Sequence, residues 1–506
     1  MYYKDRNGRP ASKEFGTSYT TSQLLEFSVI ITTYGMIRKQ KSSMDRFLAH
    51  WERWIGRSQK VQKPDYEDFP FFMISWWQIV LDEAHIVSNP FTAVSQAVCQ
   101  LEGEYRIAIT GTPLQNKIIE VQGLMAFLHI EPWQDFNAFM QVFGPTKLKI
   151  TGDSKANEQM DLLAIFICSL RAIMLRLKVG DTFNGQQVAN FKHVQPTWIR
   201  EDLTSEQQNF QNLVKFVWDP MSRAEHLLAK KDGLDVGVLG RDDILPAIIE
   251  ARLACLHPAC VWAKYNDPDE LSVDEILEDL PEDFKDVFKL ALSQPSGDTS
   301  SHSNDSNKLQ ASDDRRKTFR AWASLGTNWS SPRINKTCEI ICGQIPRGRK
   351  IIVLCEWLCG LDILHAALES YGHEVLRYDG SSTSKERNGA LNKFRLDSSC
   401  YVLLMTIRAG GLGLNLQIAK VVVHLNCSWN PAVTDQGTAR VVRDGNDDDL
   451  EVFRFVANDS MESYVLRTAD SKRSMASQVL DPDEDIVTRI SDAAGWDPYI
   501  YEAKVS

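Results

Sequence analysis

The sequence predicts an α/β protein with two lobes, each built on a parallel β-sheet, and a different kind of segment between them. Short apolar runs that end in polar residues recur in two blocks of the chain, with segments of helical spacing between the runs. Such runs are typical of strands buried on both faces of a parallel sheet. Strands that alternate with helices indicate the α/β class.

The first lobe is predicted over residues 1–190, and we regard its sheet as incomplete. Its expected helices span 92–101 and 118–128. Its expected strands span 27–34, 77–83 and 105–112.

The second lobe is predicted over residues 331–480, with helices expected at 361–370 and 385–394. The strands expected in this lobe span 350–355, 374–380, 401–406, 420–426 and 451–456.

The middle of the chain has a different composition. Residues 191–292 are predicted to form a helical insertion followed by an acidic segment, and 293–330 a flexible linker rich in Ser, Asn and Asp. Residues 481–506 are expected to be a loosely attached tail. We interpret the acidic run as a solvated surface, with a site for a histone or another basic partner as the alternative.

Composition limits the classes of function. A length of 506 residues allows two or three domains. The net charge of -11 disfavours a protein that coats nucleic acid through bulk charge, although a local basic groove remains compatible with it.

The ten cysteines include no C-x-x-C pair, so we expect isolated thiols rather than a zinc site. No signal peptide or apolar run of transmembrane length is recognisable, which predicts an intracellular protein without membrane contact.

The strongest motif is "IVLDEAH", residues 79–85, where an apolar strand ends in two carboxylates. Ligands of open α/β sheets bind at the carboxyl ends of the strands. A carboxylate there can hold Mg²⁺ through water, and the next one can deprotonate an attacking water. We therefore predict Asp82 as the metal residue and Glu83 as the catalytic base. A helix-start capping sequence is the alternative explanation.

Two further segments follow predicted strands. "TGTPLQN", residues 110–116, offers hydroxyls and amides that could sense a γ-phosphate, although a plain turn would explain it equally well if it stood alone. "TIRAGGLGLNLQIA", residues 406–419, contains glycines that allow backbone N–H groups to approach phosphate oxygens. By itself a glycine-rich loop is weak evidence for such a site.

An arginine pair completes the set. Arg440 and Arg443 lie three residues apart, on one face of a predicted helix. An arginine that reaches a transferring γ-phosphate accelerates transfer by about 10³–10⁵. Outside this context, such a pair usually marks a solvated face.

Taken in order, these motifs resemble the Swi/Snf family of helicase-like ATPases. The resemblance covers roughly residues 25–139 and 331–466. It implies two RecA-like lobes that bind ATP and Mg²⁺, and translocation along double-stranded DNA in chromatin remodelling or DNA repair. Implied partners are DNA and nucleosomes or other chromatin proteins, and the implied location is the nucleus. A DEAH-type RNA helicase is the disfavoured alternative, because those proteins carry other residues in place of TGTPLQN and of WNP, residues 429–431.

The resemblance also implies roles for individual residues. Catalysis is assigned to Glu83, Arg440 and Arg443, and metal binding to Asp82. Nucleotide sensing and coupling are assigned to His85, Thr110, Gly111, Thr112, Gln115 and Gln436. Contact with DNA is assigned to Thr406, Gly410, Gly411, Gly413, Asn415 and Trp429.

Departures from the family pattern limit what is expected of the chain. No G-x-x-x-x-G-K-[ST] sequence occurs in the 506 residues, and this loop normally binds the nucleotide phosphates. The chain by itself is therefore expected to hydrolyse ATP negligibly, either because a gene model is truncated or because the protein is a degenerate ATPase that serves as a DNA- or chromatin-bound scaffold. Asp444, beside Arg443, could pair with that arginine and weaken its action.

Overall fold

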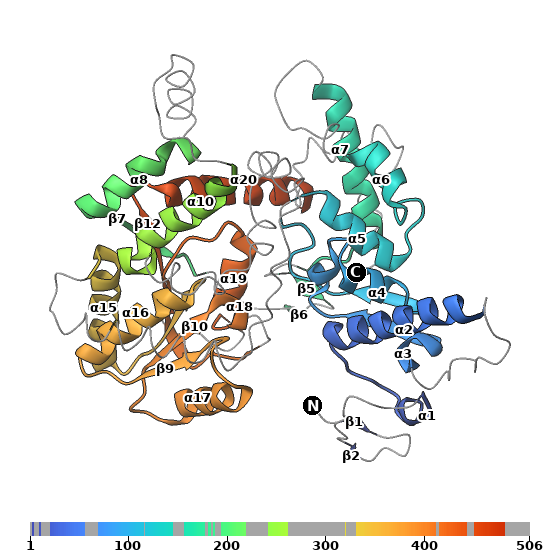
Figure 1. The fold of residues 1–506 in the computed structure, drawn as a ribbon, viewed down its shortest axis with the longest axis horizontal. Coiled ribbons are helices and arrows are strands. Elements are labelled where there is room, and N and C mark those ends of the chain that lie inside the picture. The colour runs from blue at the N-terminus through green and yellow to red at the C-terminus, as the bar shows by residue number, and fades with distance from the viewer. Residues whose placement is uncertain are drawn as a thin grey trace. The chain divides into compact units, whose positions relative to one another are not determined.

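A computed structural model describes the following residues: 3–4, 10–11, 21–55, 69–115, 117–144, 156–177, 181–183, 186–187, 194–218, 241–261, 319, 330–410, 414–442 and 450–480. The chain divides into two compact units (Figure 1). Unit 1 comprises Met1–Met174 and Ala476–Pro498, and unit 2 comprises Leu175–Met475 and Tyr499–Ser506.

Unit 1 contains two parallel strands, β3 (Trp76–Leu81) and β4 (Gly103–Ala108), joined through the helix α4 (Ala93–Cys99). One face of this sheet carries Ile79 and Leu81 into an apolar core. The other elements of the unit are β1 (Tyr3–Lys4), β2 (Pro10–Ala11), α1 (Thr21–Leu24), α2 (Tyr34–Ile55), α3 (Pro70–Met73), the 3₁₀ helix η2 (Ala84–Val87), α5 (Ile119–Leu128), α6 (Phe136–Phe143) and α7 (Ala156–Ile173).

The strand expected at 27–34 is not formed. Phe27 makes an isolated bridge, the next residues belong to no regular element, and α2 begins at Tyr34. Val29 and Ile31 are 61% and 56% exposed. An extended segment becomes a strand only where a neighbouring strand exchanges backbone hydrogen bonds with it. Within the described part of unit 1, the parallel sheet has only β3 and β4.

Unit 2 contains a six-stranded parallel sheet of order β7-β12-β11-β8-β10-β9. All five strands predicted for the second lobe form, and every residue of β8 is buried, as expected for a central strand. The strands are β7 (Thr197–Glu201), β8 (Lys350–Cys355), β9 (Val375–Tyr378), β10 (Val402–Thr406), β11 (Ala419–His424) and β12 (Glu451–Ala457).

Helices cover both faces of this sheet. One face packs against α8 (Ser205–Trp218), α10 (Arg241–Leu256), α15 (Pro332–Gln344), α16 (Leu358–Ser370) and the first turns of α20 (Met461–Leu480). The opposite face packs against α17 (Ser384–Leu396), α18 (Ile407–Gly410) and α19 (Pro431–Ala439). The remaining elements are β5 (Thr182–Phe183), β6 (Gln186–Gln187) and the 3₁₀ helix η5 (Ile345–Arg347).

The middle of the chain differs from the expected separate insertion. Helices α8 and α10 do form, but they share the core of unit 2, and residues 197–201 add an edge strand to its sheet, with Ile199 beside Phe455. The division between the units falls after Met174 rather than at residue 190. Strand β7 has only five residues, and its partner β12 lies about 250 positions later in the chain, so the sequence around 197–201 gives little indication of a strand. The acidic run at 267–286 and the tail at 481–506 lie outside the described residues.

Among the described helices, none combines the length and the apolar character that crossing a membrane requires.

Candidate active site

The carboxylates of the DEAH motif lie at the carboxyl end of β3. Glu83 adopts a left-handed conformation, with φ 50° and ψ 49°. A residue other than glycine in this region costs of order 1–3 kcal/mol and persists where the surroundings determine it. Here the Ala84 N–H donates to the Ile109 carbonyl at 2.9 Å, and the Glu83 N–H donates to Asp82 Oδ1 at 3.0 Å. The backbone thus holds Glu83 in a strained turn at the end of the strand.

Tyr34 supports this turn from α2. Its hydroxyl donates to the Asp82 carbonyl oxygen at 2.8 Å. Burial, together with the nearby charges of Asp82 and Glu83, raises the pKa of Tyr34 to about 12, so the hydroxyl keeps its proton at neutral pH. The sequence predicted Tyr34 as a strand residue and missed this role, because the contact joins positions 48 apart.

His85 lies beside the predicted base. Its Nδ1 is 3.4 Å from Glu83 Oε2. Burial lowers the pKa of His85, against the opposing effects of Glu83 and Glu120. The imidazole is therefore neutral at pH 7 and adds a polar contact, rather than a positive charge, next to Glu83.

The TGTPLQ segment follows β4 and is ordered by its own side chains. The Thr112 N–H donates to Thr110 Oγ1 at 3.1 Å, and Gln115 Nε2 donates to Thr112 Oγ1 at 2.9 Å. The Gln115 N–H donates to Glu120 Oε2 of α5 at 2.7 Å. Because β3 and β4 are parallel neighbours, this segment starts at the same sheet edge as the DEAH carboxylates. A Cβ added at Gly111 would meet no atom within 4 Å.

Magnesium could be held here in its usual way. Mg²⁺ keeps several waters and uses one or two carboxylates together with substrate phosphates. Asp82, exposed at the strand end, fits that mode and would supply charge neutralisation next to the nucleotide. Across the described residues, no group of three or more His, Cys, Asp or Glu side chains forms a ready-made metal cage.

In unit 2, α19 carries two of the predicted residues. Gln436 is half-buried on this helix, and Arg440 is its C-cap residue. The Arg440 carbonyl accepts a hydrogen bond from the Leu416 N–H at 3.0 Å, which ties the helix end to the segment after the glycine-rich loop. Arg443, the partner predicted for Arg440, lies outside the described residues.

The residues predicted to face DNA have different environments. Thr406 ends β10, Gly410 ends α18, and Asn415 is exposed, with its carbonyl accepting from Arg395 Nη2 at 2.9 Å. Gly411 and Gly413 lie outside the described residues.

The expectation that Trp429 contacts DNA is not supported by its position. Trp429 is only 2% exposed. Its ring packs edge-on against Tyr464, with centroids 5.9 Å apart, and lies 5.6 Å from the Arg252 guanidinium. The reason is local: the segment between β11 and α19 is buried, so an aromatic side chain there fills the core.

Comparisons with known proteins identify two family domains in this chain. Residues 11–260 match the SNF2-related domain, and residues 332–445 match the helicase conserved C-terminal domain. An uncharacterized ATP-dependent helicase of Schizosaccharomyces pombe is 24% identical, over 90% of this chain and 51% of that protein. Transcription termination factor 2 of Drosophila melanogaster is 25% identical over 90% of this chain and 45% of its own length.

The DNA repair protein RAD5 of Saccharomyces cerevisiae is 22% identical over 90% of this chain and 44% of its own length. The chain thus spans about half the length of these curated relatives. A crystal structure of the C-terminal part of the Fun30 ATPase domain aligns with a TM-score of 0.36 and 19% identity, over 57% of this chain and 98% of that one.

Proposed function

We infer a function from the premise that this chain belongs to the SNF2-related family of helicase-like ATPases. We propose that it is a DNA-dependent ATPase that couples ATP hydrolysis to movement along duplex DNA, in chromatin remodelling or DNA repair in the nucleus. The main support is the turn at the end of β3, where Asp82 and a left-handed Glu83 lie at the same sheet edge as Thr110 and Thr112.

In the proposed mechanism, the carboxylates of unit 1 have separate tasks. Asp82 would bind Mg²⁺ through water, which neutralises charge on the nucleotide phosphates. Glu83 orients the attacking water and accepts its proton. Thr110, Thr112 and Gln115 form the hydrogen-bonded chain that would respond to loss of the γ-phosphate.

The second unit would supply positive charge and contact with DNA. Arg440 and Arg443 would stabilise the charge that develops on the transferring phosphoryl group. Thr406 and Asn415, with the glycines of the AGGLG segment, would contact the DNA backbone. Gln436, on the same helix as Arg440, would take part in nucleotide binding.

A DNA-binding experiment is the first test. Affinity for a fluorescent duplex is measured over a series of salt concentrations. Backbone contacts predict that log K falls linearly with log salt concentration. Absence of binding at low salt would contradict the proposal.

Phosphate release is the second test. The 506 residues contain no G-x-x-x-x-G-K-[ST] sequence, so we expect release by this chain alone to stay near background with or without DNA. Turnover comparable to that of an active family member would refute that expectation. If the reading frame upstream of Met1 encodes Gly-Lys-Thr, the extended chain is assayed with Glu83→Gln as its control.

A degenerate ATPase that acts as a DNA-bound scaffold is the alternative. It predicts DNA binding without DNA-stimulated phosphate release, in the extended chain as well.

A further inference from the structure

The segment Leu425–Asn430, called here the link, connects β11 to α19 and is buried along its whole length. Its residues range from 0% exposed at Leu425 to 9% at Ser428. Connections between elements usually run over the surface, because a buried loop must find protein partners for its backbone groups. The partners of this link come from remote parts of unit 2.

Arg252 of α10 provides one partner. Its Nη2 donates to the Cys427 carbonyl oxygen at 2.6 Å and to Glu356 Oε2 at 2.6 Å. Its guanidinium lies over the Trp357 ring at 4.7 Å and the Trp429 ring at 5.6 Å. The side chain is 5% exposed, so these contacts form away from solvent.

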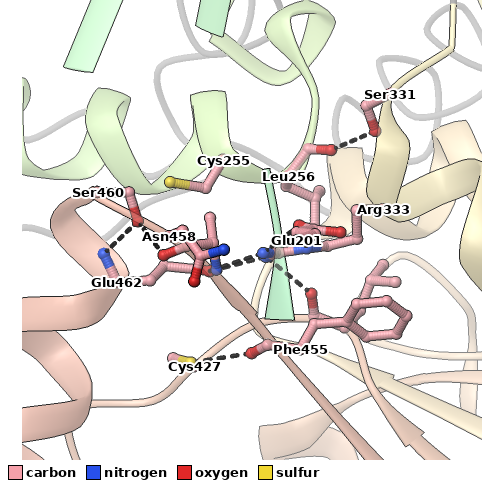
Figure 2. A network of polar contacts seen from close by, with 12 residues as sticks. Glu201, Cys255, Leu256, Ser331, Arg333, Cys427, Phe455, Asn458, Ser460 and Glu462 are labelled. Atoms are coloured by element: carbon pink, nitrogen blue, oxygen red, sulfur yellow. Dashed lines mark hydrogen bonds and ion pairs between the residues drawn. The ribbon is translucent and has the colours of Figure 1, made fainter. Parts of the chain in front are cut away.

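Arg333 of α15 provides the second partner. Its Nη1 donates to the Leu425 carbonyl oxygen at 3.2 Å. The same guanidinium makes a two-pronged ion pair with Glu462, with both distances 2.7 Å, and its Nε donates to Glu201 at 2.6 Å. Figure 2 shows Arg333 with Glu201 and Glu462, together with the Cys427 thiol donating to the Phe455 carbonyl. Arg333 is fully buried.

A third contact lies between these two. Asn426 Oδ1 accepts from the Glu356 N–H at 2.9 Å, which joins the link to the end of β8. The carbonyls of Leu425 and Cys427 and the side chain of Asn426 are therefore all held. The N-cap residue of α19, Asn430, follows three residues after Cys427.

We propose that Arg252 and Arg333 are positioning residues that hold the link in one conformation and thereby set the direction of α19. Arg252 and Arg333 lie 175 and 92 positions from the carbonyls that they bind. Helices α10 and α15, which carry these arginines, therefore help to position α19. The inference rests on the proposed function in one respect: α19 carries Gln436 and ends at Arg440, to which that function assigns nucleotide binding and catalysis.

Arg252 is the better of the two for a test. Removal of Arg333 would leave the carboxylates of Glu201 and Glu462 buried without their cation, which would destabilise the whole unit strongly. Glu356 is 22% exposed at its side chain, so the loss of Arg252 leaves a carboxylate that water can reach.

The experiment compares Arg252→Gln and Arg252→Lys with the wild-type chain, and with Arg347→Lys as a control at an exposed arginine of the same unit. Hydrogen exchange is followed by mass spectrometry in peptides that cover 425–439 and in peptides that cover β8. Neither nucleotide nor DNA is added, so the result does not depend on whether the proposed ATPase function is correct.

For Arg252→Gln we expect exchange in 425–439 to rise roughly tenfold or more, because the link loses its charge-assisted hydrogen bond at the Cys427 carbonyl, while exchange in β8 is unchanged. Arg252→Lys should give a smaller local rise, because an ammonium cannot stack as a planar guanidinium does while bonding two acceptors. The control should behave as wild type. An equal rise in β8 would show that Arg252 merely stabilises the whole unit, and no rise in 425–439 would show that it does not hold the link; either result overturns the proposal.

Discussion

Acidification should destabilise unit 2 through one buried histidine. His424 ends β11 and is 1% exposed. Its Nε2 lies 2.8 Å from Thr438 Oγ1, and that hydroxyl donates onward to the Thr434 carbonyl at 3.2 Å. The hydroxyl therefore accepts from the histidine, which fixes the hydrogen on Nε2. Burial lowers the pKa of His424 to about 3, and the positive charge of Arg454 contributes in the same direction.

The sign and size of the effect follow from proton binding. In the unfolded chain this histidine protonates near pH 6.5, while in the folded chain it stays neutral until about pH 3. Between these values the unfolded state binds more protons, so the stability that is present above pH 6.5 is lost as the pH falls. At pH 5, which is 1.5 units below 6.5, the loss is about 2 kcal/mol at about 1.4 kcal/mol per unit.

The assay must report on unit 2, because His424 lies in that unit. Pulsed hydrogen exchange in urea, read on peptides from β8 and β11, gives the free energy of unfolding at pH 7.5 and at pH 5. His424→Gln keeps a side-chain donor for Thr438 and cannot titrate. We expect wild type to lose about 2 kcal/mol more than this variant over the interval. Equal losses would refute the proposed burial of a neutral histidine.

Three further substitutions test other contacts. Burial raises the pKa of Glu201, so the wild-type chain loses stability as the pH rises through the raised pKa and this carboxyl ionises. Glu201→Gln cannot titrate and should therefore gain stability relative to wild type between pH 4 and 7. The opposite trend in the same exchange assay would contradict this. Tyr34→Phe should cost about 1 kcal/mol in the unfolding of β3, through the lost hydrogen bond to Asp82, and Tyr371→Phe, at a residue 57% exposed, should cost nothing measurable. Gly437→Ala and Gly343→Ala gain the same helix propensity, but the Cβ at position 437 would lie 2.9 Å from Leu354 Cδ1, whereas the one at position 343 meets no atom within 4 Å. Gly437→Ala should therefore be less stable than Gly343→Ala by about 1 kcal/mol, and equal thermal shifts for the two variants would argue against the close approach of α19 to β8.

The sheet of unit 2 was largely predictable from the sequence. Strands buried on both faces must be apolar throughout, so β8, β10 and β11 stand out as continuous hydrophobic runs. The carboxylates of the DEAH motif were placed correctly at the end of β3, because a strand that ends in charged residues ends at the sheet edge. The catalytic roles assigned to these residues stay predictions.

Other features were decided only by tertiary structure. The strand β7 is short and pairs with β12 at the far end of the chain, while the apolar run at 27–34 has no strand partner in the described residues. The full burial of Arg333 is equally invisible in the sequence, where an arginine suggests a solvated surface. In each case the outcome depends on which remote group supplies the hydrogen bonds or the opposite charge. Local periodicity encodes which face of an element is apolar, and it does not encode the identity of a distant partner.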